Sequence, residues 1–64
     1  AVERALRRLP PRERAALLLR EVEGLSTREV AEILESTEAT VRSQIYQARL
    51  HLRQIIEDQT RRTK

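Results

Sequence analysis

Cysteine, methionine, tryptophan and phenylalanine are absent from this 64-residue sequence, which has one tyrosine, one glycine and one histidine. Without cysteine there is no disulfide and no thiolate metal site, and one histidine cannot form an imidazole cluster. We therefore expect no metal, no other cofactor and a reducing, cytoplasmic setting. No apolar run approaches the roughly 20 residues of a membrane-spanning helix, and no signal peptide is recognisable. Membrane insertion is thus not expected.

The usual signatures of an enzyme are also missing. The sequence pairs no nucleophile with a general base and has no glycine-rich phosphate loop. Glu29 and Glu32, like Glu35 and Glu38, are carboxylates three residues apart, but roles at helix N-termini explain them without a catalytic pocket. His51 falls on a polar helix face, where we expect it to be solvated. We expect no catalytic residue.

Length and charge favour one small domain that attracts a polyanion. Residues 1–64 suffice for a single domain, and a start without Met inside a helical pattern is typical of a domain from a longer protein. Residues 1–40 contain seven arginines against eight glutamates, a net charge of −1, whereas residues 41–64 contain six basic against two acidic residues, a net charge of +4. Attraction to a polyanion explains this asymmetry better than solubility alone.

The longest helical pattern covers residues 40–56. Its apolar side chains recur at steps of four and three residues and form one narrow stripe, which consists of Val41, Ile45, Ala48, Leu52 and Ile55. The opposite arc is cationic and rich in amides, as an element that enters the DNA major groove requires. The alternative is that these polar residues only keep a surface helix soluble. We expect the helix to run from about 38 to 57, with 58–64 as a frayed basic tail.

Two short helices are predicted before the only glycine. The first has an apolar face that includes Leu6 and Leu9, and it ends by Leu9 because Pro10 disfavours helical geometry in the residue before it. Pro10 and Pro11 then open the second helix, where a proline costs little because the first amides are unbonded. Its wide apolar face, residues 15–19 and 22, predicts that it is the best-buried helix. Gly24 suits a left-handed C-terminal cap.

A helix-turn-helix follows the glycine. Ser26 and Glu29 have the spacing of a capping box, which marks the start of a third helix of about two turns. After a break of about three residues, Ser36 and Thr37 supply the N-cap of the long helix. A cap, a short helix, a tight break and a long basic helix occur in the order of this motif. The sequence therefore predicts an all-α, compact four-helix domain with a long C-terminal recognition helix.

The segments ALRRLPPRERAALLLREVEGLSTREVAEIL and TVRSQIYQARLHLR resemble region 4 of bacterial sigma factors of the extracytoplasmic-function (ECF) group. The markers are Leu-Pro before the second helix, Glu-Gly-Leu-Ser before the third, and Thr-Val-Arg-Ser followed by Ala-Arg in the fourth. The resemblance spans roughly residues 1–57. LuxR-type regulators share some of these markers, but the preceding Pro-Pro helix pair and the length of the last helix disfavour that family.

The resemblance implies a function and its residues. Region 4 binds the −35 promoter element in double-stranded DNA, docks on the β flap of RNA polymerase and is often masked by an anti-sigma factor. It implies base reading early in the fourth helix, by Arg42, Ser43, Tyr46 and Gln47, with phosphate contacts from Thr40, Arg49 and Arg53. Packing beneath the arginines is an alternative for Tyr46. A partner-binding groove is expected between the first two helices, formed by Leu6, Leu9, Leu17, Leu18 and Val22.

Three departures from the family pattern keep a rival function open. Glu35, Ser36 and Ala39 replace a Gly, an apolar residue and a Gly in the turn, so Glu35 costs stability if its backbone is left-handed. Gln44 and Gln47 stand where many relatives carry arginine, which reduces attraction to phosphate. Leu50 adds an apolar spot beside Tyr46. The rival is a sigma-like module that binds an anti-sigma factor without reading DNA.

Overall fold

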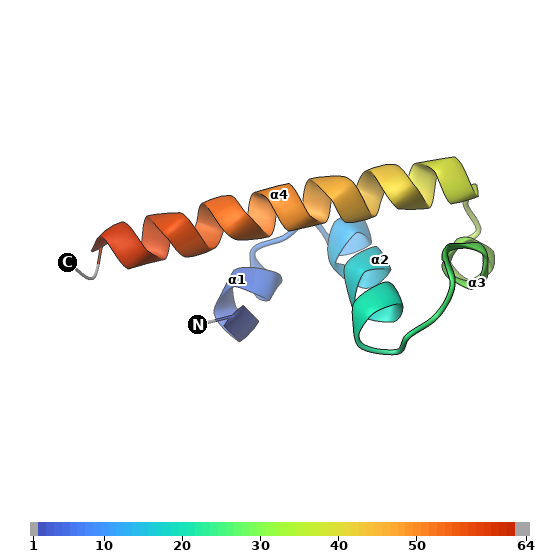
Figure 1. The fold of residues 1–64 in the computed structure, drawn as a ribbon, viewed down its shortest axis with the longest axis horizontal. Coiled ribbons are helices and arrows are strands. Elements are labelled where there is room, and N and C mark those ends of the chain that lie inside the picture. The colour runs from blue at the N-terminus through green and yellow to red at the C-terminus, as the bar shows by residue number, and fades with distance from the viewer. Residues whose placement is uncertain (1, 63–64) are drawn as a thin grey trace.

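The computed structural model describes residues 2–62, and side chains up to residue 61. This part of the chain forms four α-helices and no strand: α1 (Val2–Arg7), α2 (Pro11–Glu21), α3 (Thr27–Ile33) and α4 (Glu38–Arg62). In Figure 1, the long helix α4 has the other three helices on one side of it. The helix α3 lies near the N-terminal end of α4, α2 near its middle and α1 towards its C-terminal half. The predicted all-α, four-helix fold is confirmed.

The core lies between α4 and the three shorter helices. Val41, Ile45 and Ala48 are buried, and Leu52 and Ile55 pack against the same cluster while half-buried, so the predicted stripe of α4 is confirmed. Six side chains from the shorter helices and the α1–α2 connection are buried with it or beside it: Ala5, Leu9, Ala16, Leu17, Val30 and Ala31.

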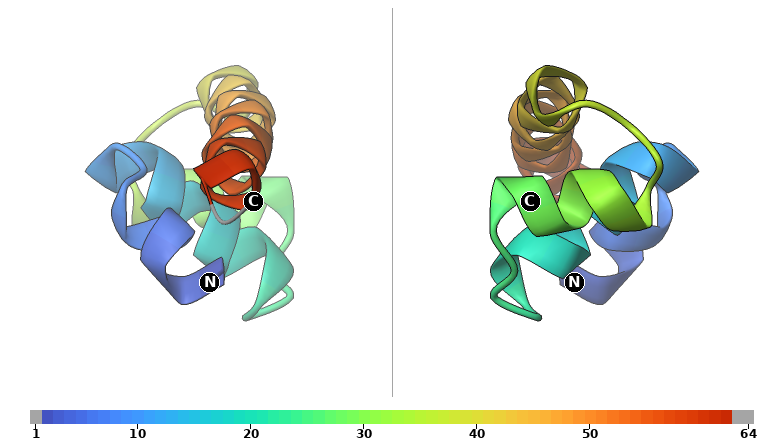
Figure 2. Two further views of the ribbon diagram at one scale, coloured as in Figure 1. Left: turned by 90° about the vertical axis from the view of Figure 1, so that its left-hand side faces the viewer. Right: turned by 90° about the vertical axis from the view of Figure 1, so that its right-hand side faces the viewer.

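The second helix is less buried than its sequence suggested. Only Ala16 and Leu17 of α2 are buried, and Val22 at its C-terminal end is 71% exposed. In Figure 2, where α4 is viewed along its length, α2 runs across α4 and not alongside it. Because α2 crosses α4, only part of the apolar face of α2 lies against it, and the fully buried Ala16 and Ala48 belong to the same core cluster.

The connections before α3 follow the sequence prediction. Hydrogen bonds of 3.1 Å from the amides of Arg8 and Leu9, each to the carbonyl three residues earlier, close α1 just before Pro10. The second helix begins at Pro11. The amides in the first turn of a helix have no partner within the helix, so a proline there removes no hydrogen bond. Gly24 has a φ of 71°, the left-handed conformation predicted for it after α2.

The capping box of α3 is confirmed. The Ser26 hydroxyl accepts a hydrogen bond from the Glu29 amide at 3.1 Å, and the Glu29 carboxylate accepts one from the Ser26 amide at 2.9 Å. The hydrogen bonds from the Ser26 backbone and hydroxyl lower the pKa of Glu29 below its ordinary value. Because the folded-state pKa is lowered, this contribution to stability is complete above the ordinary carboxylate pKa and is lost as the pH falls through the lowered value.

Replacing Ser26 with alanine should destabilise the domain by about 0.5–2 kcal/mol, because the Glu29 amide loses its acceptor. For a domain of this size each kcal/mol lowers the melting temperature by about 4–8 °C. Thermal melting by circular dichroism measures the change. The control is Ser26→Asp, which keeps an acceptor oxygen at the N-cap and should melt close to the wild type. An unchanged melting temperature for Ser26→Ala would mean that the cap contributes nothing.

The turn of the helix-turn-helix contains the expected left-handed residue. Glu35 has a φ of 52°, and it is the only described residue other than glycine with a positive φ. The amide of Ser36 donates to the Ala31 carbonyl at 2.8 Å and the amide of Glu35 to the Glu32 carbonyl at 3.3 Å, which are the two bonds of a Schellman motif. A glutamate thus occupies the position that favours glycine.

Replacing Glu35 with glycine should raise the free energy of unfolding by about 1 kcal/mol, since the left-handed conformation costs a residue with a Cβ roughly 1–2 kcal/mol and glycine's larger entropy loss offsets part of the gain. Urea unfolding measures the difference through the transition midpoint. Glu35→Ala removes the same charge but keeps the Cβ, so it should give no such gain. Equal stabilisation by both substitutions would assign the effect to charge and not to backbone strain.

The prediction that the long helix ends near residue 57 is wrong for the described residues, because α4 continues to Arg62. Residues 58–62 include no proline or glycine to end it. The Thr60 hydroxyl also donates to the Ile56 carbonyl at 3.0 Å within this last part of the helix. Residues 63 and 64 of the expected frayed tail lie outside the described residues.

Candidate nucleic-acid interface

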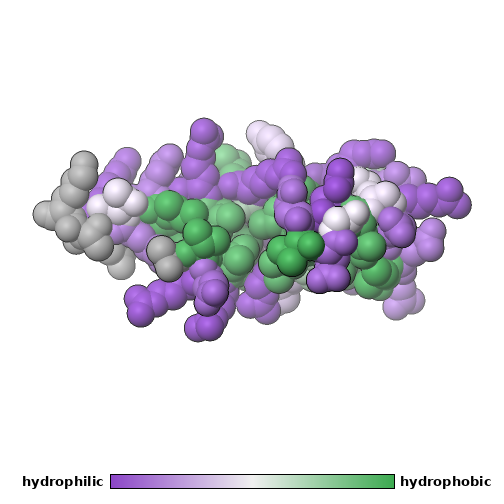
Figure 3. All heavy atoms as spheres, turned by 60° about the horizontal axis from the view of Figure 1, so that its bottom comes forward, coloured by the Kyte–Doolittle hydropathy of each residue, from purple (hydrophilic) through white to green (hydrophobic). Residues whose placement is uncertain are grey.

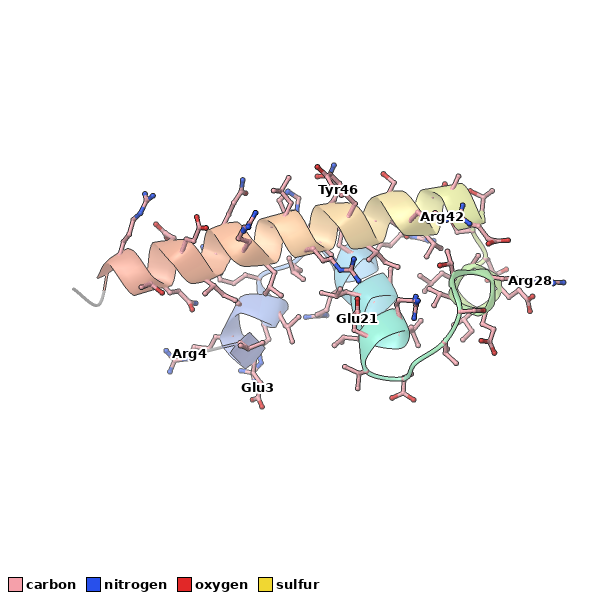
Figure 4. The ribbon with its side chains drawn as sticks, in the orientation of Figure 1. Glu3, Arg4, Glu21, Arg28, Arg42 and Tyr46 are labelled. Carbon is pink, nitrogen blue, oxygen red and sulfur yellow. The ribbon has the colours of Figure 1, made fainter. Side chains whose placement is uncertain are left out.

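The structure places all seven predicted DNA-contacting residues on α4. Thr40, Arg42, Ser43, Tyr46, Arg49 and Arg53 are exposed, and Gln47 is half-buried. Figure 4 shows Tyr46 projecting from α4 on the side opposite α1, α2 and α3. Because Tyr46 is 66% exposed, it does not adopt the alternative position beneath the arginines. The outer face of α4, defined by these seven residues, is accessible to a large ligand.

The first turn of α4 is fixed by two threonines. The Thr37 hydroxyl accepts a hydrogen bond from the Thr40 amide at 3.1 Å and donates one to the Thr40 hydroxyl at 2.9 Å. Thr37 is thus the N-cap that the sequence predicted, and it holds the Thr40 side chain in place. A residue held in this way presents its hydroxyl at low entropic cost.

Each of the three arginines on the outer face lies beside a carboxylate. Arg42 pairs with Glu38 at 3.3 Å and Arg53 with Glu57 at 4.0 Å, both four residues apart on α4. Arg49 pairs with Glu21, which comes from α2. All three arginine side chains are more than half exposed, and exposed pairs contribute only about 0.2–1 kcal/mol. A phosphate group can therefore replace these carboxylates at small cost.

Two side-chain contacts hold α4 across α2. The His51 ring nitrogen Nδ1 donates a hydrogen bond to the Glu13 carboxylate at 2.7 Å, and the Glu13 side chain is only 16% exposed. The expectation that His51 is solvated is therefore only partly correct, because its side chain is 40% exposed but α2 brings Glu13 to it. Arg49 and His51 lie two residues apart, on different sides of α4, and they contact carboxylates near opposite ends of α2. These contacts join α2 and α4 at two points beside the apolar core.

Sequence reasoning missed a concavity where α2 and the start of α3 meet α4. It has a volume of about 330 Å³ and is lined by Arg20, Thr27, Arg42, Ile45, Tyr46 and Arg49. Arg20 and Thr27 come from outside α4, so no periodicity along that helix identifies them. A second hollow of about 320 Å³ lies beside it and is lined by Tyr46, Arg49, Leu50 and Arg53. The predicted apolar spot at Leu50 belongs to this hollow, where Leu50 is half-buried.

The predicted partner groove is not a single surface. Leu9 and Leu17 are 4% and 6% exposed and belong to the core, so their assignment to the groove is wrong. The reason is that α1 and α2 both pack on α4, which draws these two side chains inwards. Leu6 and Leu18 are half-buried, and Val22 is exposed. Figure 3 shows apolar surface on the side of the molecule that carries the short helices, bordered by hydrophilic residues.

Two kinds of site are absent from the described residues. No three histidine, cysteine, aspartate or glutamate side chains in that part of the chain come together as metal ligands would. None of the helices in the same residues is both long and apolar enough to cross a membrane.

Two comparisons with known proteins relate this chain to sigma factors. The family described as "Sigma-70, region 4" matches residues 1–52, which include α1, α2, α3 and more than half of α4. The RNA polymerase sigma-H factor of Pseudomonas aeruginosa is 44% identical over 48 residues, which cover 75% of this chain and 25% of that protein. The chain thus spans about a quarter of the length of this relative. Because the family match covers most of the chain, the chain belongs to the sigma-70 region 4 family, whose members are DNA-binding domains and not enzymes.

Proposed function

We propose that this chain is the region 4 domain of an ECF-group sigma factor, which reads the −35 promoter element and so directs RNA polymerase to promoters in the cytoplasm. The observation that carries the proposal is the outer face of α4: it is exposed, it is basic, and no other helix of the described residues covers it. Membership of the region 4 family supports the same reading.

The geometry suits the major groove. A recognition helix contacts base edges with the residues near its N-terminus and meets the backbone further along. Arg42 lies in the second turn of α4, where its guanidinium suits the O6 and N7 acceptors of guanine. Gln47 suits the N6 and N7 groups of adenine, and Tyr46 offers an apolar ring between them. Thr40, Arg49 and Arg53 flank these residues and contact phosphates in this arrangement.

Fluorescence anisotropy tests the proposal on a −35-like duplex and a scrambled duplex at two salt concentrations. Preferential binding to the −35-like duplex is expected at both. If the chain binds neither duplex at low salt but still holds an anti-sigma factor, the promoter function is wrong and the rival interaction module is correct. Equal binding to both duplexes would leave DNA binding in place and remove the promoter specificity.

The proposal includes two protein partners, the β flap of RNA polymerase and an anti-sigma factor. An amphipathic helix from a partner is expected to bury apolar residues against the surface around Val22 and Leu18. Both residues lie in or just after the second half of α2, and Val22 is the more exposed of the two. This position leaves the outer face of α4 free, so the β flap and DNA can bind together.

Val22→Glu should weaken binding to the flap helix by about tenfold or more, because a charge would be buried in an apolar interface. DNA affinity should change by less than about twofold, as a single charge away from the outer face is largely screened. Isothermal titration with a flap-helix peptide measures the first effect and anisotropy the second. The control Val22→Ile keeps the apolar surface and should bind normally. Unchanged peptide affinity for Val22→Glu would remove this surface from the interface.

A further inference from the structure

The concavity between α2, α3 and α4 has the composition of an anion site. Arg20, Arg42 and Arg49 line it, and these three guanidinium groups come from two helices that cross. Like charges are brought together here, although the fold gains nothing from their repulsion. Only one carboxylate from α2 reaches this cluster in an observed contact, that of Glu21, which pairs with Arg49.

Glu21 holds Arg49 as a phosphate would. Carboxylate and phosphate oxygens both accept paired hydrogen bonds from a guanidinium group, so one can replace the other on the same arginine. The Glu21 side chain is 45% exposed and the Arg49 side chain 61%, which means that the pair is open to a competing anion. Figure 4 places Glu21 on α2, on the opposite side of α4 from Tyr46.

We propose that this concavity binds a phosphodiester group of the DNA backbone, held by Arg20 and Arg49, and that Glu21 occupies Arg49 as an internal competitor in the free protein. The site rests on the proposed function, because the outer face of α4 must already lie against DNA for a phosphate to reach it. Arg42 and Tyr46, two of the proposed base-reading residues, line the same concavity. When DNA binds, Arg49 exchanges the Glu21 carboxylate for a DNA phosphate. The competing Glu21 carboxylate therefore lowers the affinity for DNA.

The first test removes the competitor. Glu21→Gln should strengthen binding to the −35-like duplex by about two- to fivefold at low salt, since Arg49 no longer gives up an ion pair. The log–log salt slope should become steeper by up to about one unit, because one more uncompensated cation meets the backbone. Glu23→Gln is the matched control: it gives the same change in net charge two residues away, at an exposed position outside the concavity, and should change affinity by less than about twofold.

The second test removes the newly assigned cation. Arg20→Gln should weaken binding to all duplexes by about three- to tenfold and make the slope shallower by about one unit. Arg4→Gln is its control, because Arg4 lies on α1 and points away from α4 in Figure 4. Equal effects of Glu21→Gln and Glu23→Gln, or of Arg20→Gln and Arg4→Gln, would overturn the site while the reading of the −35 element stands. All four side chains are exposed, and circular dichroism verifies that each variant stays folded.

A third measurement does not require DNA. During titration with inorganic phosphate, NMR should show the Nε–Hε signals of Arg20 and Arg49 shifting together, at lower phosphate concentration in Glu21→Gln than in the wild type. The Arg4 signal should not follow them. If all three arginines shift alike, binding is diffuse and the proposed site is wrong. A site that binds phosphate in a chain that binds no duplex would reject the promoter function and its phosphodiester ligand together.

Discussion

Arg42→Ala is expected to cost about 1–3 kcal/mol of binding free energy on the −35-like duplex and to relax the base preference at one position. The Arg42 side chain is 65% exposed and near the N-terminus of α4, where a recognition helix approaches base edges most closely. Its pair with Glu38 is an exposed contact four residues away, which contributes little and orients the guanidinium group. A paired contact to guanine O6 and N7 therefore contributes more binding free energy than the contact with Glu38 that it replaces.

Anisotropy on a set of duplexes with single base changes measures this effect. Wild-type protein should discriminate at the position that Arg42 reads, whereas the alanine variant should bind all four bases there nearly equally. Arg42→Lys is the informative control, because it keeps the charge but lacks the planar fork that pairs with guanine. Arg42→Lys should regain the general affinity for DNA that Arg42→Ala loses, but not the discrimination between bases. If Arg42→Ala lowers affinity equally for every duplex, Arg42 contacts a phosphate and not a base.

Features set by neighbouring residues could be predicted from the sequence. The prolines at the α1–α2 junction, the capping box at Ser26 and the left-handed Gly24 each depend on residues within a few positions. The stripe from Val41 to Ala48 is likewise a periodic pattern within one helix. Local rules of this kind also identified the outer face, because an apolar stripe on one side of a helix leaves the opposite arc exposed.

Features set by helix crossing could not be predicted. The contacts of Glu13 with His51 and of Glu21 with Arg49 join residues 38 and 28 positions apart, and their pairing depends on the direction in which α2 crosses α4. The same crossing decides that Leu17 enters the core while Val22 stays exposed. An apolar face in the sequence indicates that a helix packs against other elements, but it does not show which part of that face these elements bury.

Three ion pairs, one with α2 and two within α4, change how the basic character of the chain should be understood. Arg42, Arg49 and Arg53 each have a carboxylate beside them, so the outer face of α4 carries less free positive charge than its arginines suggest. In the proposed promoter complex we therefore expect a modest general attraction to DNA and a larger share of the affinity from base contacts. A larger share of base contacts favours promoter reading, because binding to competing non-specific sites is weaker.

Salt should weaken DNA binding by the largest factor of any change considered. With three to five phosphate contacts, the slope of log K against log salt is about −3 to −5, so a rise from 50 to 200 mM salt should lower affinity by about 60- to 1,000-fold. Arg49→Ala should weaken all duplexes alike and make the slope shallower by about one unit, since it removes one phosphate contact. Anisotropy across five salt concentrations gives both slopes.

The control for Arg49→Ala is Arg4→Ala, which makes the same change in net charge on α1, far from the outer face. Its slope should match that of the wild type, because counterions are released only where a cation meets a phosphate. Gln47→Arg should act in the opposite direction: it adds a cation to the outer face, raises affinity for scrambled duplexes and reduces discrimination. A slope for Arg49→Ala equal to that of the wild type would show that Arg49 keeps its contact with Glu21 in the complex and never meets the backbone.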